Sequence, residues 1–312
     1  MKALNDIPEI RHKSISQHPL VNAQPQHRIL ELGQTFESKG LSPNVSKMLY
    51  AVRNINRLMF EKVEHSSAFT TEKTWVKDPS GDLVAQGGGV MTLLRGKILE
   101  KAAVNCSIVA GDKYPSIEHE YKDKPFLAAG VSLICHPLNP NAPIAHMNVR
   151  VLKVGQGEQT RQWIGGGADL TPMVKFSEDT QEFHKQMEDV CLAHPKGDYQ
   201  KYRKWCDEYF LIPHYQEPRG VGGIFFDYLT MDSEDDLDFL AMVGEQFARV
   251  YGRILERRVD MPYDAELKDK HLHWRGRYAE FNLAYDRGTR FGLMSGGNVE
   301  AIFASLPPTV KW

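Results

Sequence analysis

The sequence has 312 residues, of which 42% are hydrophobic and 25% are charged, and its formal net charge is −2. This composition is typical of a globular protein with a large core, and nothing in its overall charge indicates binding to nucleic acid or to an anionic membrane. No apolar run approaches the roughly 18 residues of a membrane span, and the first residues, MKALNDIPEIRHK, lack the apolar core of a signal peptide. The cysteines, Cys106, Cys135, Cys191 and Cys206, show no C-x-x-C spacing, which favours reduced thiols in the cytoplasm.

The first half of the chain is predicted to contain one helix and a series of strands. Residues 1–26 are polar and weakly patterned, so we expect a loosely ordered arm. Apolar residues then recur at intervals of three and four over residues 43–64, which predicts a helix with one buried face. Strand-like runs separated by turn residues follow at 73–77, 83–86, 90–94, 98–104, 106–110, 126–135, 145–153 and 162–164. Their short connections predict antiparallel pairing, since parallel neighbours need a crossover of about a dozen residues.

The second half of the chain is predicted to alternate helices with strands. Helices are expected from Ser177 to about Pro195, over 199–210, and from the capping-box-like Ser233 to about Arg258. Strands are expected over 224–228, 278–285 and 289–293, followed by a tight corner at 296–298 and a short helix. No break in composition divides the chain. We therefore expect one α+β domain over residues 27–312, with a large antiparallel sheet flanked on both sides by helices.

Polar side chains gather on two of the predicted strands, in the stretch 126–150. Because side chains alternate between the faces of a strand, Ser132 shares one face with His136, and His146 shares one with Asn148 and Arg150. If the two strands pair, a hydroxyl, imidazoles, an amide and a guanidinium converge on one patch, which can bind an anion and move a proton. The alternative is an ordinary half-buried strand with a hydrated face.

Two further features have alternative interpretations. The run Gly165–Gly166–Gly167 lacks the spacing of a phosphate-binding loop, which favours a tight connection or a bulge. Asp227 ends an apolar run, where a carboxylate needs a partner. It either pairs with an arginine or faces a ligand that carries N–H groups.

Histidines and arginines provide other candidate groups. Four histidines on separate predicted elements, His136, His146, His184 and His214, either bind a metal ion from distant segments or serve as proton donors and structural hydrogen-bonding groups. The arginines of the last predicted strands either receive carboxylates together with Arg150 or form a solvated sheet edge. They are Arg275, Arg277, Arg287 and Arg290.

Seven sequence blocks, in one order, carry a resemblance that covers the chain from about residue 30 to its end. They are GGGVMTLLRGKILEKAAVNCSIVAG (87–111), AAGVSLICHPLNPNAPIAHMNVR (128–150), WIGGGADLTP (163–172), YRKWCDEYF (202–210), RGVGGIFFDYL (219–229), RGRYAEFNLAYDRGTRFGL (275–293) and SLPPTVKW (305–312). In these blocks the chain resembles the oxygen-dependent coproporphyrinogen-III oxidases of heme biosynthesis. The resemblance implies oxidative decarboxylation of two propionates of coproporphyrinogen III to vinyl groups, giving protoporphyrinogen IX, CO2 and H2O2. It implies O2 as co-substrate, no organic cofactor, and a homodimer whose dimerisation region is 278–312.

The resemblance also implies roles for individual residues. His146 matches the proton donor, and Asp227 matches the acid that meets the pyrrole N–H groups. Substrate-contacting positions are matched by Ser132, Asn148, Val149, Arg150, Gly296, Gly297 and Asn298. Positions assigned to a divalent metal cation are matched by His136, His146, His184 and His214.

Three positions depart from the family pattern. Tyr215 and Asn298 stand where the family usually carries arginine, and Tyr228 stands where it usually carries a second acid. These departures keep an alternative open, a non-catalytic binder or carrier of an anionic tetrapyrrole. A histidine–metal hydrolase is a third alternative, which the histidine spacing does not favour.

Overall fold

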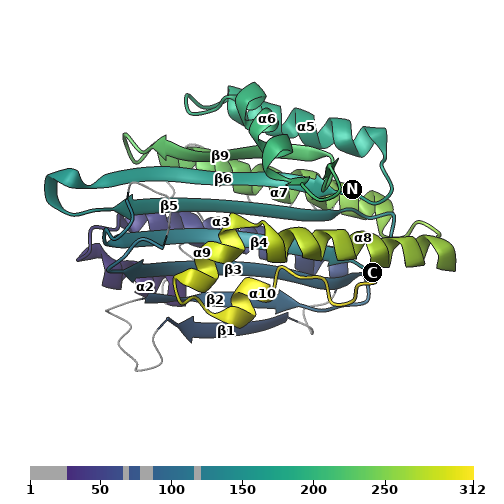
Figure 1. Cartoon of the computed structure of the whole chain (residues 1–312), viewed down its shortest axis with the longest axis horizontal. Helices are drawn as coiled ribbons and strands as arrows, with labels where there is room; N and C mark the ends of the chain where they lie inside the picture. Colours follow the sequence, from purple (N-terminus) through teal and green to yellow (C-terminus); the bar gives the residue numbers. More distant parts are fainter. Residues whose placement is uncertain (1–26, 66–69, 78–86, 116–120) are drawn as a thin grey trace.

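Strand-like runs of the first half of the chain and one strand of the second half form a single sheet in the computed structural model, which describes residues 27–65, 70–77, 87–115 and 121–312 (Figure 1). Its strands are β1 (Thr70–Val76), β2 (Gly87–Leu94), β3 (Leu99–Gly111), β4 (Phe126–Pro137), β5 (Ile144–Val154), β6 (Arg161–Thr171) and β9 (Gly222–Thr230). They lie in the order β1-β2-β3-β4-β5-β6-β9, and every neighbouring pair is antiparallel. A separate two-stranded ribbon pairs β7 (Leu211–Ile212) with β8 (Glu217–Pro218). The predicted antiparallel pairing is confirmed.

Two strands are longer than predicted. The runs 98–104 and 106–110 form the single strand β3, because Asn105 between them is a polar residue of an alternating strand and not a turn. The run 162–164 continues through the three glycines to Thr171, so these glycines are strand residues and not a tight connection. A bulge is present, however, because the register between β6 and β9 shifts by one residue at Gly165. The extra residue of this bulge lies in β9, opposite Gly165, so the glycines themselves form neither a tight connection nor the bulged strand.

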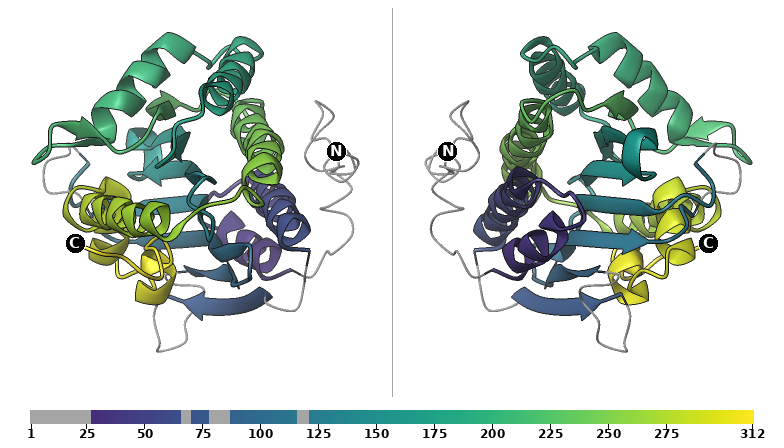
Figure 2. Two further views of the ribbon diagram at one scale, coloured as in Figure 1. Left: turned by 90° about the vertical axis from the view of Figure 1, so that its right-hand side faces the viewer. Right: turned by 90° about the vertical axis from the view of Figure 1, so that its left-hand side faces the viewer.

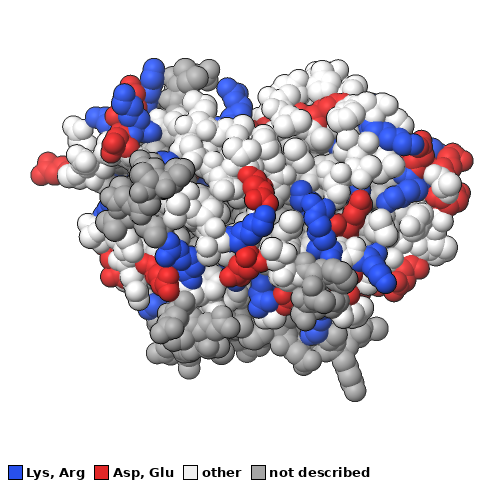
Figure 3. All heavy atoms as spheres, turned by 90° about the horizontal axis from the view of Figure 1, so that it is seen from below, with Lys and Arg blue, Asp and Glu red and all other residues white. Residues whose placement is uncertain are grey.

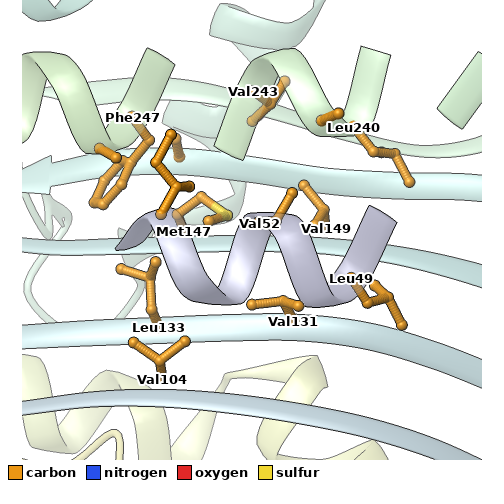
Figure 4. Close-up of a cluster of buried hydrophobic side chains, with 14 of the residues drawn as sticks. Leu49, Val52, Val104, Val131, Leu133, Met147, Val149, Leu240, Val243 and Phe247 are labelled. Atoms are coloured by element: carbon orange, nitrogen blue, oxygen red, sulfur yellow. The ribbon is translucent and has the colours of Figure 1, made fainter. Parts of the chain in front are cut away.

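One face of the sheet is covered by helices that form the main core. These are α2 (Arg28–Glu37), α3 (Pro43–Glu64), α5 (Ser177–Leu192) and α7 (Asp236–Arg258) (Figure 2). Leu49 and Val52 of α3 pack with Phe247 of α7 and with Val131 and Val149 of the sheet (Figure 4). Burying each such side chain contributes about 1.5–3 kcal/mol. The predicted helices over 43–64, from Ser177 and up to Arg258 are confirmed.

The other face is covered by the C-terminal helices α8 (Ala265–Ala284), α9 (Arg287–Met294) and α10 (Val299–Phe303) (Figures 1 and 2). The strands predicted at 278–285 and 289–293 are wrong. Tyr278, Phe281 and Asn282 are buried at helical spacing, and the Asp286 side chain caps α9 by accepting a hydrogen bond from the Thr289 N–H. Helix α6 (Tyr199–Tyr209) lies along β9, as predicted from its sequence. The expected α+β architecture with helices on both faces is confirmed.

The helices, the surface charges and the cysteines agree with what the composition predicted. Among the described residues, none of the helices has both the length and the apolar character needed to cross a membrane. On the face of the molecule shown in Figure 3, basic and acidic side chains are interspersed. The four cysteines are free and buried. The predicted arm over 1–26 and the predicted strand at 83–86 lie outside the described residues.

Candidate active site

The polar residues of the 126–150 stretch lie side by side on the sheet, as alternation predicts. Ser132 of β4 pairs with Asn148 of β5, and Arg150 lies opposite Gly130. Ser132, His146, Asn148 and Arg150 are half-buried, on the face beneath α8–α10. Val149 points the other way and is fully buried in the main core. Of the expected substrate contacts, Val149 can therefore offer only its backbone.

Strand β6 continues this face and carries no side chain on it directly opposite Asn148 and Arg150. Gly165 and Gly167 lie opposite Arg150 and Asn148, and Asp169 lies opposite His146. The side chains of Asp227 and Arg150 occupy the space over Gly165, where a Cβ would lie 2.5 Å from Oδ1 of Asp227 and 3.0 Å from Nε of Arg150. We call Ser132, His146, Asn148, Arg150 and Asp227 the polar strip.

Asp227 reaches the polar strip through the bulge in β9. Asp227 and Tyr228 together oppose the single residue Gly165, and Tyr228 adopts a left-handed backbone conformation with φ 53°. Such a conformation costs about 1 kcal/mol or more for a residue other than glycine, and it is typical of functional sites. A Cβ at Gly165 would lie 2.5 Å from Oδ1 of Asp227, so only glycine leaves room for this carboxylate.

Arg150 binds Asp227 directly. Its Nη2 lies 2.6 Å from Oδ2 of Asp227, and its Nη1 donates to Oδ1 of Asn148 at 2.6 Å. Burial alone would lower the pKa of Arg150, but the Asp227 carboxylate outweighs burial and raises that pKa. The arginine pairing considered for Asp227 is therefore present, on the same sheet face as His146.

His146 contacts two buried residues, Asp169 and Arg219, through a chain of interactions that the sequence did not predict. Its Nδ1 lies 3.0 Å from Oδ1 of Asp169, and Nη2 of Arg219 donates to Oδ2 of Asp169 at 2.7 Å. Burial opposes ionisation of Asp169, but Arg219 and His146 prevail and lower the pKa of this carboxyl group. Alternation along β6 was a usable signal for Asp169. Arg219 lies 50 residues further along the chain and had no local signal.

The predicted corner at 296–298 is present between α9 and α10. Gly296 has φ 71°, and the Asn298 side chain caps α10 by accepting a hydrogen bond from the Ala301 N–H at 2.9 Å. The Ala301 carbonyl accepts from Nδ2 of Asn105 at 2.6 Å, and Asn105 pairs with Ser132 in the sheet. These contacts connect the corner to the β3 side of the polar strip.

The four histidines expected to bind a metal have separate partners. Fully buried His136 places Nε2 2.8 Å from the Ser305 carbonyl, and burial holds its pKa well below the usual range. His184 contacts the Tyr199 hydroxyl and the Val221 carbonyl, both at 2.9 Å. His214, at the surface, contacts the Tyr285 hydroxyl at 2.9 Å and Glu280 at 3.1 Å.

These positions do not fit a shared metal site in one chain. Within residues 27–65, 70–77, 87–115 and 121–312, no group of three or more His, Cys, Asp or Glu side chains is placed to hold a metal ion.

Comparison with known proteins identifies the family. Residues 44–312 match the sequence profile of the family described as coproporphyrinogen III oxidase. This chain belongs to the coproporphyrinogen III oxidase family.

Individual relatives agree with the family assignment. The chain is 42% identical over 266 residues to proteins named "Oxygen-dependent coproporphyrinogen-III oxidase" from Rickettsia bellii (strain RML369-C) and Rickettsia akari (strain Hartford). A protein of the same name from Rickettsia rickettsii (strain Sheila Smith) is also 42% identical over 266 residues. Each match covers 81% of this chain and 91% of the relative.

Three of the C-terminal arginines of this family member, Arg275, Arg277 and Arg287, contact different groups. Arg275 is fully buried and pairs with Glu100 at 2.6 Å. Arg277 lies over the Tyr215 ring at 3.2 Å. Arg287 lies over Phe225, as Arg150 does, at 5.7 and 5.9 Å from the ring centroid. Arg287 is thus the one of these three that approaches the polar strip.

The three departures from the family pattern lie in different places. Tyr215 is at the surface beneath the Arg277 guanidinium, and Asn298 is a helix cap. Tyr228 belongs to the bulge beside Asp227. Of the three, Tyr228 is the direct sequence neighbour of a polar-strip residue.

Proposed function

We propose that this protein is an oxygen-dependent coproporphyrinogen-III oxidase, which converts coproporphyrinogen III and O2 to protoporphyrinogen IX, CO2 and H2O2. Family membership and the names of the relatives support the activity. The observation that carries the proposal for this site is the Arg150–Asp227 ion pair on the same sheet face as His146. It brings together a cation for a propionate, an acceptor for pyrrole N–H groups and a group that can transfer protons.

Substrate binding is proposed to exchange the partners of this ion pair. The macrocycle carries four carboxylates and four pyrrole N–H groups. A propionate takes the place of Asp227 on Arg150, and pyrrole N–H groups take the place of Arg150 on Asp227. Each exchange replaces one charge-assisted hydrogen bond with another, worth about 1.5–3 kcal/mol, so the pair can open without leaving a charge unpaired.

The chemical steps follow from the charges of the polar strip. Asp227 accepts a pyrrole N–H proton, which makes the ring electron-rich enough to react with O2. The resulting peroxide removes a hydrogen from the propionate side chain, and loss of CO2 leaves the vinyl group. Two electrons pass from the side chain to O2, which leaves as H2O2. The protonated His146 ring supplies the second proton to the departing peroxide, and Asp227 returns its proton to the pyrrole nitrogen. Ser132, Asn148 and the 296–298 corner are proposed to orient the substrate.

The test is turnover by the purified protein. With coproporphyrinogen III and air, we expect protoporphyrin fluorescence after oxidation of the product, and no product without O2. Binding of the substrate under anaerobic conditions, with no product when air is admitted, would instead favour the non-catalytic carrier. Product formation without O2 would contradict the proposed reaction.

A homodimer is proposed through the segment 278–312. Large apolar side chains of this segment are exposed, among them Leu283 (54%), Leu293 (43%), Met294 (48%) and Val299 (54%). Clustered exposed apolar residues are typical of interaction surfaces. The Leu293→Glu variant should shift the mass measured by light scattering from dimer to monomer.

The free, buried cysteines support the cytoplasm as the compartment.

A further inference from the structure

The Arg219 side chain is buried at a place where a charge is costly. It is 2% exposed, and its guanidinium carbon lies 3.9, 4.7 and 4.9 Å from the ring centroids of Phe210, Tyr278 and Phe281. Its Nε has no hydrogen-bond partner among the described residues. Removing a guanidinium from water costs several kcal/mol unless it is paired. The ion pair with Asp169 is therefore the contact that keeps Arg219 in this position.

Asp169 connects this buried cation to His146. The carboxylate is 2% exposed and uses its two oxygens separately, with Oδ1 directed to Nδ1 of His146 and Oδ2 directed to Arg219. Thr171 also donates to Oδ2, at 3.4 Å. An ionised carboxylate only accepts hydrogen bonds, so the hydrogen in the 3.0 Å contact must lie on Nδ1 of His146.

Phe210 contacts both Arg219 and His146, the two residues that Asp169 connects. Its ring lies beneath the Arg219 guanidinium and also meets the His146 ring edge-on, with the ring centroids 6.2 Å apart. The imidazole plane is fixed by this contact and by Asp169, while the His146 side chain stays 23% exposed. With Nδ1 engaged, Nε2 is the atom left to meet a ligand on the polar strip.

We propose that Arg219 is a positioning residue, which acts through Asp169 to keep a hydrogen on Nδ1 of His146, so that Nε2 is the nitrogen that takes up a proton and delivers it at the substrate. Arg219 touches no reacting atom. It keeps Asp169 ionised and aimed, and Asp169 sets the ring. The effect on turnover rests on the proposed function, whereas the tautomer does not.

Kinetics separate this role from a purely structural one. Arg219→Met keeps the length of the side chain between the three rings and removes its charge. We expect kcat to fall about 10- to 100-fold while KM changes less than about threefold, because the lost interaction acts on the proton donor and not on substrate binding. Arg219→Lys keeps a cation and should recover most of the loss.

A double-mutant cycle gives the deciding kinetic comparison. If Arg219 acts through His146, Arg219→Met should cause no further loss in a His146→Gln background. An equal fold-loss in both backgrounds would overturn the proposal. Thermal unfolding of each variant reports any loss of structure.

A spectroscopic measurement on the wild-type protein avoids the risk that a variant misfolds. In alkaline buffer, ¹⁵N NMR of histidine-labelled protein distinguishes the two neutral tautomers, and the signals of His146 are those lost in His146→Gln. We expect hydrogen on Nδ1 and none on Nε2. The opposite tautomer would overturn the inference even if the enzyme is active. The expected tautomer without turnover would refute only the proposed function.

Discussion

Asp227→Asn tests the central ion pair, because it replaces a carboxylate with an amide of nearly equal size. Two unit charges about 4 Å apart attract by about 4 kcal/mol at an effective dielectric constant of about 20. The side chains of Arg150 and Asp227 are 28% and 13% exposed, so water screens part of this attraction. We expect a net loss of about 1–2 kcal/mol in the free energy of unfolding, which lowers Tm by a few degrees.

The expected effect of the same substitution on turnover is larger. An amide cannot take the pyrrole proton, so kcat should fall at least about 100-fold, equivalent to about 2.7 kcal/mol of transition-state stabilisation. The assay is protoporphyrin fluorescence at saturating coproporphyrinogen III, with substrate affinity measured separately under anaerobic conditions. Affinity should fall far less than kcat, since Arg150 still binds a propionate.

Glu100→Gln provides the matched control. It removes the carboxylate of another 2.6 Å ion pair, with Arg275, away from the polar strip. This variant should lose a comparable amount of stability and keep kcat within about threefold of the wild type. If Asp227→Asn also stays within threefold, or if Glu100→Gln loses as much activity, the proposed role of Asp227 is refuted.

Three further predictions concern single positions. Gly165→Ala would place Cβ 2.5 Å from Oδ1 of Asp227, so kcat should fall about tenfold; unchanged kcat would show that the ion pair need not keep this geometry. His214→Ala should keep kcat within about threefold, because this ring only bridges surface groups; a large loss would show that the expected metal set assembles during turnover. Burial lowers the pKa of His271 from 6.5 to about 2. Below pH 6.5 the unfolded state therefore binds a proton that the folded state does not. The free energy of unfolding should then fall, as the pH is lowered, by up to about 1.4 kcal/mol per pH unit. His271→Leu should therefore flatten the decline of Tm on acidification from pH 6.5, and an identical decline in variant and wild type would exclude His271 as a cause.

The sequence predicted the polar strip well because its signal is local. The alternation of β5 alone gave the shared face of His146, Asn148 and Arg150. The pairing of this strand with the strand that carries Ser132 was predicted from the short loop between them. Alternation and short connections involve residues that are close in the sequence, and the strand backbone fixes the face on which each of their side chains lies.

Other features depended on contacts that leave no local pattern. In the segment 279–285 apolar residues alternate with polar Glu280 and Asn282, which suits a strand. The residues that the structure buries, Tyr278, Ala279, Phe281 and Asn282, have helical spacing instead. Arg219 reaches Asp169 across 50 residues, and no spacing rule connects them. The histidines are spread over several elements, so sequence alone could not show that His136 is fully buried against Ser305 while His214 is at the surface.

Strand β5 contributes residues to both the main core and the polar strip. Met147 and Val149 are fully buried and alternate along β5 with His146, Asn148 and Arg150 of the polar strip. A change in volume at either of these two positions moves the same backbone that aims Asn148 and Arg150. Selection for core packing and selection for activity therefore act on the same strand. A substitution that repacks the core at β5 should change activity before it changes the fold.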